Sequence, residues 1–450
     1  MLPVAAVLLP ILFVYFNPPF MPRLFTTQEH LFGMFSFWMW LALSINILHT
    51  LRRHPKPSLE KLTIFVLPFL VSFFFLYLIV EYFERSWDYE QYEAAFRTIV
   101  QGGNPYESTR YLYPPVFAQF MASLYLFAEE HLSFLGINLW LFVYYIHQCI
   151  QFFLAILAYQ LSRRFASTVG FTEFTGTVLV SGLFVFNYPL FRTFHLNQVN
   201  LYVLNTVLVA LLTARTQPLV SGMAVAFGGL IKIYPFVLGL PMFLTRKWKA
   251  VLGIVAGMGV IILIQTRFGQ DMLLWKQFFH FYTSFPFERE SSFWFRNSSL
   301  LSFIRSLVQL TGMPESLTLP MFIVTALCVM GWVMVRFDRR RRYFAKTGNA
   351  NHPQQDIGHL IDFSVLTLLI TPSAWDHHYV VAIPLALWAM ALGWERNPGW
   401  LLFGLSSVFI LPPFDVFPFS YVRTLGIVVL LALAAPEKYP SYKEVSAGTL

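Results

Sequence analysis

The sequence predicts an all-α integral membrane protein that crosses the bilayer many times. Of its 450 residues, 57% are hydrophobic and 12% are charged, and the mean hydropathy is +0.59. A soluble chain cannot bury that much apolar surface. The apolar residues also form repeated runs of about 15–25 residues, the length of helix that spans a membrane. These runs predict roughly 12–14 transmembrane helices.

The basic residues predict which ends of the spans face the cytoplasm. The formal net charge is +8, but its lysines and arginines gather in short loops, which is typical of cytoplasmic loops and does not favour nucleic-acid binding. The most basic loop, 337–358, follows the apolar run 318–336. With that loop inside, we expect a plasma (inner) membrane protein whose outer or periplasmic loops are 81–113, 187–198, 268–298 and 374–379.

Several shorter features refine this prediction. The apolar runs 114–128 and 299–312 are short, and the loop charges predict that both are surface or re-entrant helices on the outer side. A helix break is expected at residues 232–235, where a proline limits the helix. Cys149 and Cys328 lie in apolar runs and are expected to be buried, without a disulfide or a metal.

The outward loops hold most of the polar residues that are suited to chemistry. Asp88 lies beyond the apolar run that ends at Val80, and an acidic residue at the exit of a span requires a reason. A carboxylate that is ionised at neutral pH accepts a proton from an attacking hydroxyl, so Asp88 is a candidate base; it is also a candidate cap for the next helix. The other candidates are Arg110, Tyr113, Arg192, Gln198, Asn200, Lys232, Asn297, His377 and His378.

Some of these candidates have the chemistry that an anion requires. A buried lysine without a partner is costly, so Lys232 either reaches an interface or meets an anion. His377 and His378 either bind a phosphate or belong to an interfacial aromatic belt. Gln198 and Asn200 either cap a helix or hydrogen-bond to a sugar or phosphate. No spacing indicates a metal site, and we expect no metal and no cofactor.

Five short motifs, taken in their order along the chain, resemble glycosyltransferase family 87. They are Asp88 with Tyr92, Ala95 and the stretches 102–106 and 113–117, Asn197-Gln198-Val199-Asn200, Lys232-Ile233-Tyr234-Pro235, Asn297-Ser298-Ser299-Leu300 and Trp375-Asp376-His377-His378. Asn197 stands where the family has glycine, and Ser298 where it has glutamine. The resemblance covers roughly residues 62–436.

This resemblance implies a membrane transferase of the GT-C class that uses polyprenyl-phosphate-linked mannose or a related hexose. Asp88 would be the general base for an acceptor hydroxyl of a lipid or glycan, with inversion at the sugar carbon. The implied partners are the donor, the acceptor and membrane lipids. The chain would divide into an added N-terminal transmembrane hairpin at 1–60, a catalytic domain at 61–436 and a polar cytoplasmic tail at 437–450.

Two other function classes are alternatives. A transporter or flippase for a lipid-linked glycan is expected to show internal repeats and ionisable residues near the middle of the membrane. A polymerase or ligase that uses diphosphate-linked glycans would favour a large outer loop rich in arginine. The sequence shows neither an obvious repeat nor such a loop.

Overall fold

The predicted all-α architecture is confirmed by the structure, a computed structural model. It describes residues 58–82, 84–109, 111–284, 297–346, 352–394, 397–411 and 417–435. Throughout this part of the chain the regular secondary structure is helical, with one isolated bridge between Asn297 and Trp375. The hairpin predicted at 1–60, apart from its last residues, and the tail predicted at 437–450 lie outside the described residues.

The helices of the first half are α3 (Leu59–Glu81), α4 (Trp87–Val100), α5 (Pro105–Ser108), α6 (Pro115–Leu132), η1 (Ser133–Leu135), α7 (Leu139–Thr168), α8 (Glu173–Val185), α9 (Tyr188–His195), α10 (Asn200–Thr213), α11 (Pro218–Ile231), η2 (Tyr234–Leu238) and α12 (Gly239–Leu244). Those of the second half are α13 (Trp248–Gln265), α14 (Leu273–Ser284), α16 (Leu300–Leu310), η3 (Glu315–Leu317), α17 (Thr318–Lys346), α18 (Pro353–Ile370), η4 (Asp376–Ala382), α19 (Ile383–Gly393), α20 (Pro398–Leu405), η5 (Ser406–Ile410), η6 (Phe419–Tyr421) and α21 (Val422–Leu433).

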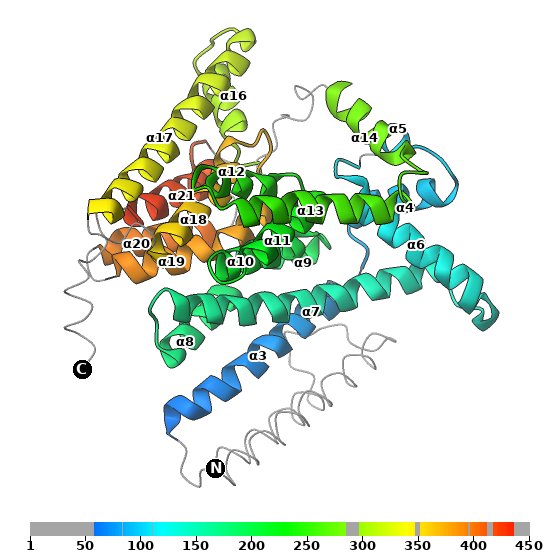
Figure 1. The fold of residues 1–450 in the computed structure, drawn as a ribbon, viewed down its shortest axis with the longest axis horizontal. Coiled ribbons are helices and arrows are strands. Elements are labelled where there is room, and N and C mark those ends of the chain that lie inside the picture. Colours follow the sequence, from blue (N-terminus) through cyan, green and yellow to red (C-terminus); the bar gives the residue numbers. More distant parts are fainter. Residues whose placement is uncertain are drawn as a thin grey trace.

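The helices form three groups (Figure 1). At one end α4, α5, α6 and α14 contact one another, and at the other end α18, α19, α20 and α21 pack together. The middle group is α10, α11 and α13, with α7 running along it. The long helix α17 and its neighbour α16 project from the body.

Several helices are long and apolar enough to cross a membrane, which supports a multi-pass membrane protein. Among the described residues they are α3, α7, α13 and the segment Glu315–Lys346, and α8 with α9 forms a fifth if this pair, bent by 52°, is one span. Six further apolar helices have 10–17 residues. The count of 12–14 spans therefore stays a prediction.

The helix break expected at residues 232–235 is present. Helix α11 ends at Ile231, and Lys232 has an extended backbone with φ −141° and ψ 128°. The short helix η2 then begins at Tyr234, with Pro235 in its first turn. Helices α6 and α16 also form close to where surface helices were predicted, while their orientation to the membrane stays a prediction.

One prediction is wrong and another is refined. The basic segment predicted at 337–358 begins as helix, because α17 continues to Lys346, and its cytoplasmic position stays a prediction. Arg336 and Arg340 turn inward and pair with Asp362 of α18 at 3.0 and 2.9 Å. Cys149 and Cys328 are free, as expected, but exposed rather than buried. An apolar run therefore did not reveal which helix faces point outward, since a span presents apolar residues to lipid as well as to protein.

Glycines let α11 and α13 approach each other closely. A Cβ on Gly253 of α13 would lie 2.2 Å from the Leu219 carbonyl oxygen, and one on Gly222 of α11 would lie 1.9 Å from the Ala250 carbonyl oxygen. Backbone therefore packs on backbone at these points, in the manner of small-residue helix contacts in membranes. This packing fixes the axis of α11, which ends one residue before Lys232.

We expect Gly253→Val to destabilise the protein by about 1–3 kcal/mol or more, because its side chain overlaps the backbone of α11. The measurement is thermal unfolding in detergent. Gly259→Val is the matched control on the same helix, since a Cβ there meets nothing within 4 Å. Equal melting temperatures for the two variants would contradict the close α11–α13 packing.

Candidate active site

Asp88 lies in the first turn of α4, but it does not cap that helix. The N-cap is Ser86, whose Oγ accepts a hydrogen bond from the Tyr89 backbone N–H at 3.1 Å. The same hydroxyl donates to the Leu196 carbonyl at 2.7 Å. The Asp88 carboxylate is therefore free of a capping role and is held beside the turn that follows α9.

Asn197 shapes that turn. Its φ is +50°, in the left-handed region that asparagine tolerates better than most residues and glycine adopts without strain. Its side-chain oxygen accepts the Ser86 backbone N–H at 3.1 Å. Asparagine thus meets the backbone requirement of a glycine position and also ties the start of α4 to this turn.

The Gln198 side chain reaches Asp88 directly. Its Nε2 donates to the Asp88 Oδ2 at 2.5 Å, and its Oε1 accepts from the Tyr92 hydroxyl at 2.7 Å. The two ends of the amide are thereby distinguished, with nitrogen toward the acid. The Gln198 backbone carbonyl accepts from Gln151 Nε2 of α7 at 2.6 Å, which anchors the residue from behind.

Lys232 lies on the other side of the same amide. Its side chain is buried, with 2% of the residue exposed. Nζ is 3.5 Å from Gln198 Oε1, 2.7 Å from Asn200 Oδ1 and 3.3 Å from His378 Nε2. It also lies 4.9 Å from the centre of the Tyr113 ring.

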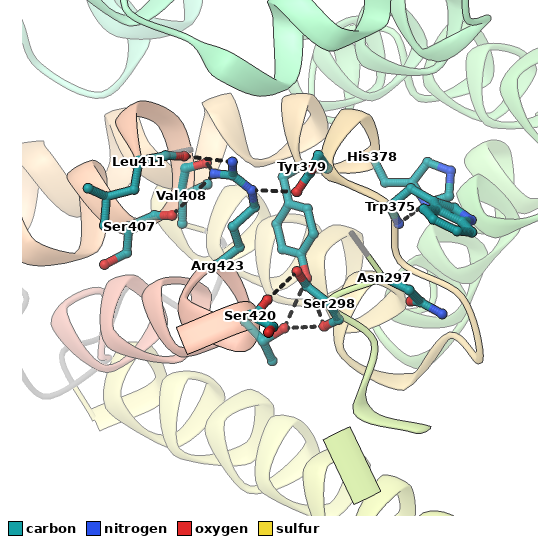
Figure 2. A network of polar contacts seen from close by, with 12 residues as sticks. Asn297, Ser298, Trp375, His378, Tyr379, Ser407, Val408, Leu411, Ser420 and Arg423 are labelled. Carbon is teal, nitrogen blue, oxygen red and sulfur yellow. Dashed lines mark hydrogen bonds and ion pairs between the residues drawn. The ribbon is translucent and has the colours of Figure 1, made fainter. Parts of the chain in front are cut away.

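His377 and His378 enter the site in different ways. The His378 ring contacts Lys232, while the backbone carbonyl of His377 accepts from Asn200 Nδ2 at 3.0 Å. The two rings lie 4.6 Å apart and are nearly perpendicular. Figure 2 shows that His378 and Tyr379 point to different sides of the turn, with His378 directed toward Trp375. The Trp375 backbone N–H donates to His378 Nδ1 at 3.3 Å.

An ion pair holds the segment 375–379, the histidine turn, in place. Asp376 is paired with Arg423 of α21 at 2.9 Å, and both residues are buried. The Arg423 guanidinium also donates to the carbonyls of Val408 and Leu411 at 2.8 and 2.7 Å (Figure 2). A buried ion pair requires such additional hydrogen bonds to offset its desolvation.

The Asn297 side chain also supports the histidine turn. Its side-chain oxygen accepts the backbone N–H groups of Ala374 and Ser299 at 3.0 and 3.1 Å. The neighbouring Ser298 carbonyl accepts from the Tyr379 hydroxyl at 3.2 Å and from Thr424 (Figure 2). Asn297 therefore positions the histidine turn rather than contacting Lys232.

Comparison with known proteins identifies a family for this chain. The family model described as Glycosyltransferase family 87 matches residues 111–351, more than half of the chain. The chain belongs to glycosyltransferase family 87. The resemblance of the motifs is thereby confirmed at the level of the family. The match includes Gln198, Asn200 and Lys232, while Asp88 and the histidine turn lie outside it.

A curated relative of this family-87 chain comes from Mycolicibacterium smegmatis (strain ATCC 700084 / mc(2)155). It is a polyprenol-phosphate-mannose-dependent alpha-(1-2)-phosphatidylinositol pentamannoside mannosyltransferase. The two chains are 24% identical over 292 residues, which covers 60% of this chain. The chain spans 65% of the relative's length, just under two thirds. No solved structure matches the chain.

The structure of this family member brings most of the predicted site residues together. Asp88, Gln198, Asn200, Lys232 and His378 form one connected polar set, with Tyr113 against Lys232 and His377 behind His378. Arg192 of α9 lies close enough to Asp88 and His377 for its charge to lower the pKa of both groups. Arg110 lies outside the described residues.

The acidic residues around this site have different environments, and the difference singles out Asp88. Asp376 is paired with Arg423, and Glu93 of α4 is paired with Arg85 and Arg97 at 3.1 and 2.6 Å. Asp88, in contrast, makes no ion pair within the described residues and bonds to a neutral amide. Burial raises the pKa of the Asp88 carboxyl, while the Gln198 hydrogen bond and the charges of Lys232 and Arg192 oppose that shift.

Sequence reasoning missed the residues that support the site from α7. Gln151 bonds to the Gln198 carbonyl, and His147 Nε2 lies 3.2 Å from the Asn197 carbonyl. Both are buried polar residues one helical turn apart in an apolar span. Polar residues in such a position are functional candidates by default, so a signal was present. Tyr234 was also missed, and its ring packs near His378 at 6.3 Å.

We expect Asn197→Ala to destabilise the protein more than Asn197→Gly. Both variants lose the bond to Ser86, worth about 0.5–1.5 kcal/mol. Alanine adds about 1–2 kcal/mol for a left-handed backbone, which glycine avoids. Thermal unfolding of the two variants in detergent measures the difference. A glycine variant as unstable as the alanine variant would show that this backbone conformation is not what Asn197 provides.

Proposed function

We propose that this family-87 transferase moves a hexose, most simply mannose, from a polyprenyl-phosphate-linked donor to an acceptor hydroxyl. The acceptor belongs to a lipid or glycan on the outer face of the plasma (inner) membrane. The donor class is that named for the mycobacterial relative. The orientation follows from the cytoplasmic basic loops predicted by the positive-inside rule.

The observation that carries this proposal is the arrangement of Asp88 and Lys232 on opposite ends of one glutamine amide. Asp88 accepts from Gln198 Nε2, and Lys232 Nζ lies 3.5 Å from Gln198 Oε1. A proton acceptor and a potential cation are therefore held one amide apart. Glycosyl transfer from a sugar phosphate requires that pair, with a base at the nucleophile and positive charge at the leaving group.

The proposed reaction is a single displacement. Asp88 removes the proton of the acceptor hydroxyl as its oxygen attacks the anomeric carbon of the donor. The bond between that carbon and the phosphate oxygen breaks, and the electron pair leaves with the polyprenyl phosphate. Attack from the face opposite the leaving group inverts the configuration. Lys232 and His378 receive the phosphate, with Tyr113, Asn200 and His377 around them, and Arg192 adds positive charge.

Burial of Asp88 suits a base. A raised pKa increases the proton affinity of the carboxylate, and the ideal pKa of a base lies near the working pH. The Gln198 hydrogen bond and the charge of Arg192, together with Lys232 when that lysine is protonated, favour the ionised form that must be present before the reaction. Asp88 is thus more basic than an ordinary aspartate while remaining a usable carboxylate.

We expect Asp88→Asn to reduce sugar transfer by about 10²–10⁴-fold, because the amide cannot accept the proton. The assay supplies polyprenyl-phosphate-linked mannose with a radiolabelled sugar and a panel of glycolipid acceptors. Glu90→Gln is the control, since Glu90 is an exposed acid two residues away on the same helix. Full activity in Asp88→Asn would remove Asp88 from the mechanism.

The pH profile of kcat/KM provides a separate test. Activity is lost as the pH falls through the pKa of Asp88, because the base becomes protonated. Gln198→Met removes a hydrogen bond that lowers this pKa. The acid limb, the fall in activity at low pH, should therefore move up by about one to two pH units, given about 1.5–3 kcal/mol for such a bond.

Tyr92→Phe is the control for the pH experiment. It removes a hydroxyl from the other end of the same amide, and the bond from Gln198 Nε2 to Asp88 remains. The acid limb should stay in place in this variant. An acid limb that does not move in Gln198→Met would mean that another group controls it.

A further inference from the structure

The hydrogen bonds around Lys232 determine how many hydrogens its nitrogen carries. Two of its three neighbours are amide oxygens whose orientation is fixed elsewhere. Asn200 directs its nitrogen to the His377 carbonyl at 3.0 Å, and Gln198 directs its nitrogen to Asp88 at 2.5 Å. Both amides therefore present oxygen to Nζ, and each accepts one N–H from it.

The third neighbour, His378 Nε2, has its role set by the other ring nitrogen. Nδ1 accepts the Trp375 backbone N–H at 3.3 Å, so it carries a lone pair. A neutral imidazole with an acceptor at Nδ1 has its hydrogen on Nε2. His378 therefore presents a donor to Lys232 Nζ across 3.3 Å.

A neutral amine matches these three neighbours, and an ammonium does not. The –NH₂ group donates two hydrogens, to Asn200 and Gln198, and its lone pair accepts the Nε2–H of His378. An ammonium has three hydrogens and no lone pair, so it would place N–H against N–H at His378. Burial also favours the neutral amine, because it lowers the pKa of Lys232 to about 7 and that of His378 well below its ordinary value.

We propose that Lys232 is neutral in the free enzyme and takes up one proton when the phosphate of the donor binds. The proton comes from solvent and bonds to the Nζ lone pair. Nζ then keeps its bonds to Asn200 and Gln198 and directs its third hydrogen at a phosphate oxygen. The Nε2–H of His378, released from Nζ, donates to the phosphate as well. The inference rests on the proposed function and assigns a protonation step to it.

The charged and titratable groups around Lys232 are few. Asp88 faces it from α4 and favours the charged form. The Tyr113 ring, whose centre is 4.9 Å from Nζ, also favours a charge there. The Tyr92 hydroxyl donates to Gln198 Oε1, and Arg192 lies toward Asp88 and His377. Within the described part of the chain, no carboxylate lies within ion-pair distance of Nζ. An arriving phosphate would thus be the first anion in direct contact with the lysine.

The test is titration calorimetry of the full-length protein in detergent with farnesyl methyl phosphate. This probe is a phosphodiester, like the donor, so it avoids the second ionisation of a phosphate monoester near about pH 6. The binding enthalpy is measured at about pH 8 in buffers of different ionisation enthalpy, and the slope gives the protons taken up. We expect close to one proton per probe, since Lys232 has a pKa of about 7 when free and a higher one beside an anion.

The affinity should follow the same linkage. The dissociation constant should be nearly constant below about pH 7 and rise about tenfold per pH unit above it, until the pKa of the complex is reached. Lys232→Arg stays charged at every pH used. It should bind the probe with no proton uptake and no such rise. Lys276→Arg, an exposed lysine on α14, is the matched control and should behave as wild type.

Two further variants make the result decisive. Lys232→Gln should show no proton uptake even if the arginine variant does not fold. Asp88→Asn should keep the uptake, because the proton goes to the lysine. Binding by wild type without proton uptake would overturn this inference and leave the proposed function standing. Uptake that persists in both Lys232 variants, or disappears in Asp88→Asn, would place the proton elsewhere. No binding of the probe by folded protein would overturn both proposals.

Discussion

The Gln198 amide keeps Asp88 and Lys232 apart, and the candidate site depends on that separation. A direct ion pair between the two would lower the proton affinity of Asp88. An amide in between bonds to both groups without neutralising either. Among the described residues, neither group is therefore held in an ion pair.

Residues outside the polar set hold this amide in place. Gln151 of α7 fixes the Gln198 carbonyl, and Asn197 turns the backbone immediately before it. The glycine contacts between α11 and α13 fix helix α11, which ends directly before Lys232. On the opposite side, the ion pair between Asp376 and Arg423 secures the histidine turn. Rigid supports of this kind matter because proton acceptors and cations work only in the correct geometry.

The sequence predicted the parts of this site but not their connections. The apolar runs indicated a helical membrane protein, and Asp88, Lys232 and the histidines were conspicuous because they interrupt those runs. What could not be predicted was which polar residues pair with each other. The sequence gives no sign that Asp376 and Asp88 differ. In the structure Asp376 pairs with Arg423, which lies 47 residues further along the chain, and Asp88 does not. Pairings across such distances depend on helix packing, which periodicity alone does not specify.

The same limit explains the errors in the helical part. A run of arginines after an apolar segment indicated a solvated loop, but the helix continues to Lys346, and Arg336 and Arg340 are buried against Asp362. The cysteines were expected to be buried because they are apolar neighbours of apolar residues. In a membrane protein, however, lipid also accepts apolar side chains, so hydrophobicity does not distinguish a core position from a lipid-facing one.

The extent of the family match shows how the site is divided along the chain. Residues 111–351 contain Gln198, Asn200 and Lys232, which occupy the centre of the polar set. Asp88 and the histidine turn come from segments on either side of that range. Both reach the centre through side chains inside it, Asp88 through Gln198 and the histidines through Asn200 and Lys232. The matched segment thus supplies the centre of the polar set, and the flanking segments supply Asp88 and the histidines. Asp88, the proposed base, is linked to the matched segment by its hydrogen bond from Gln198.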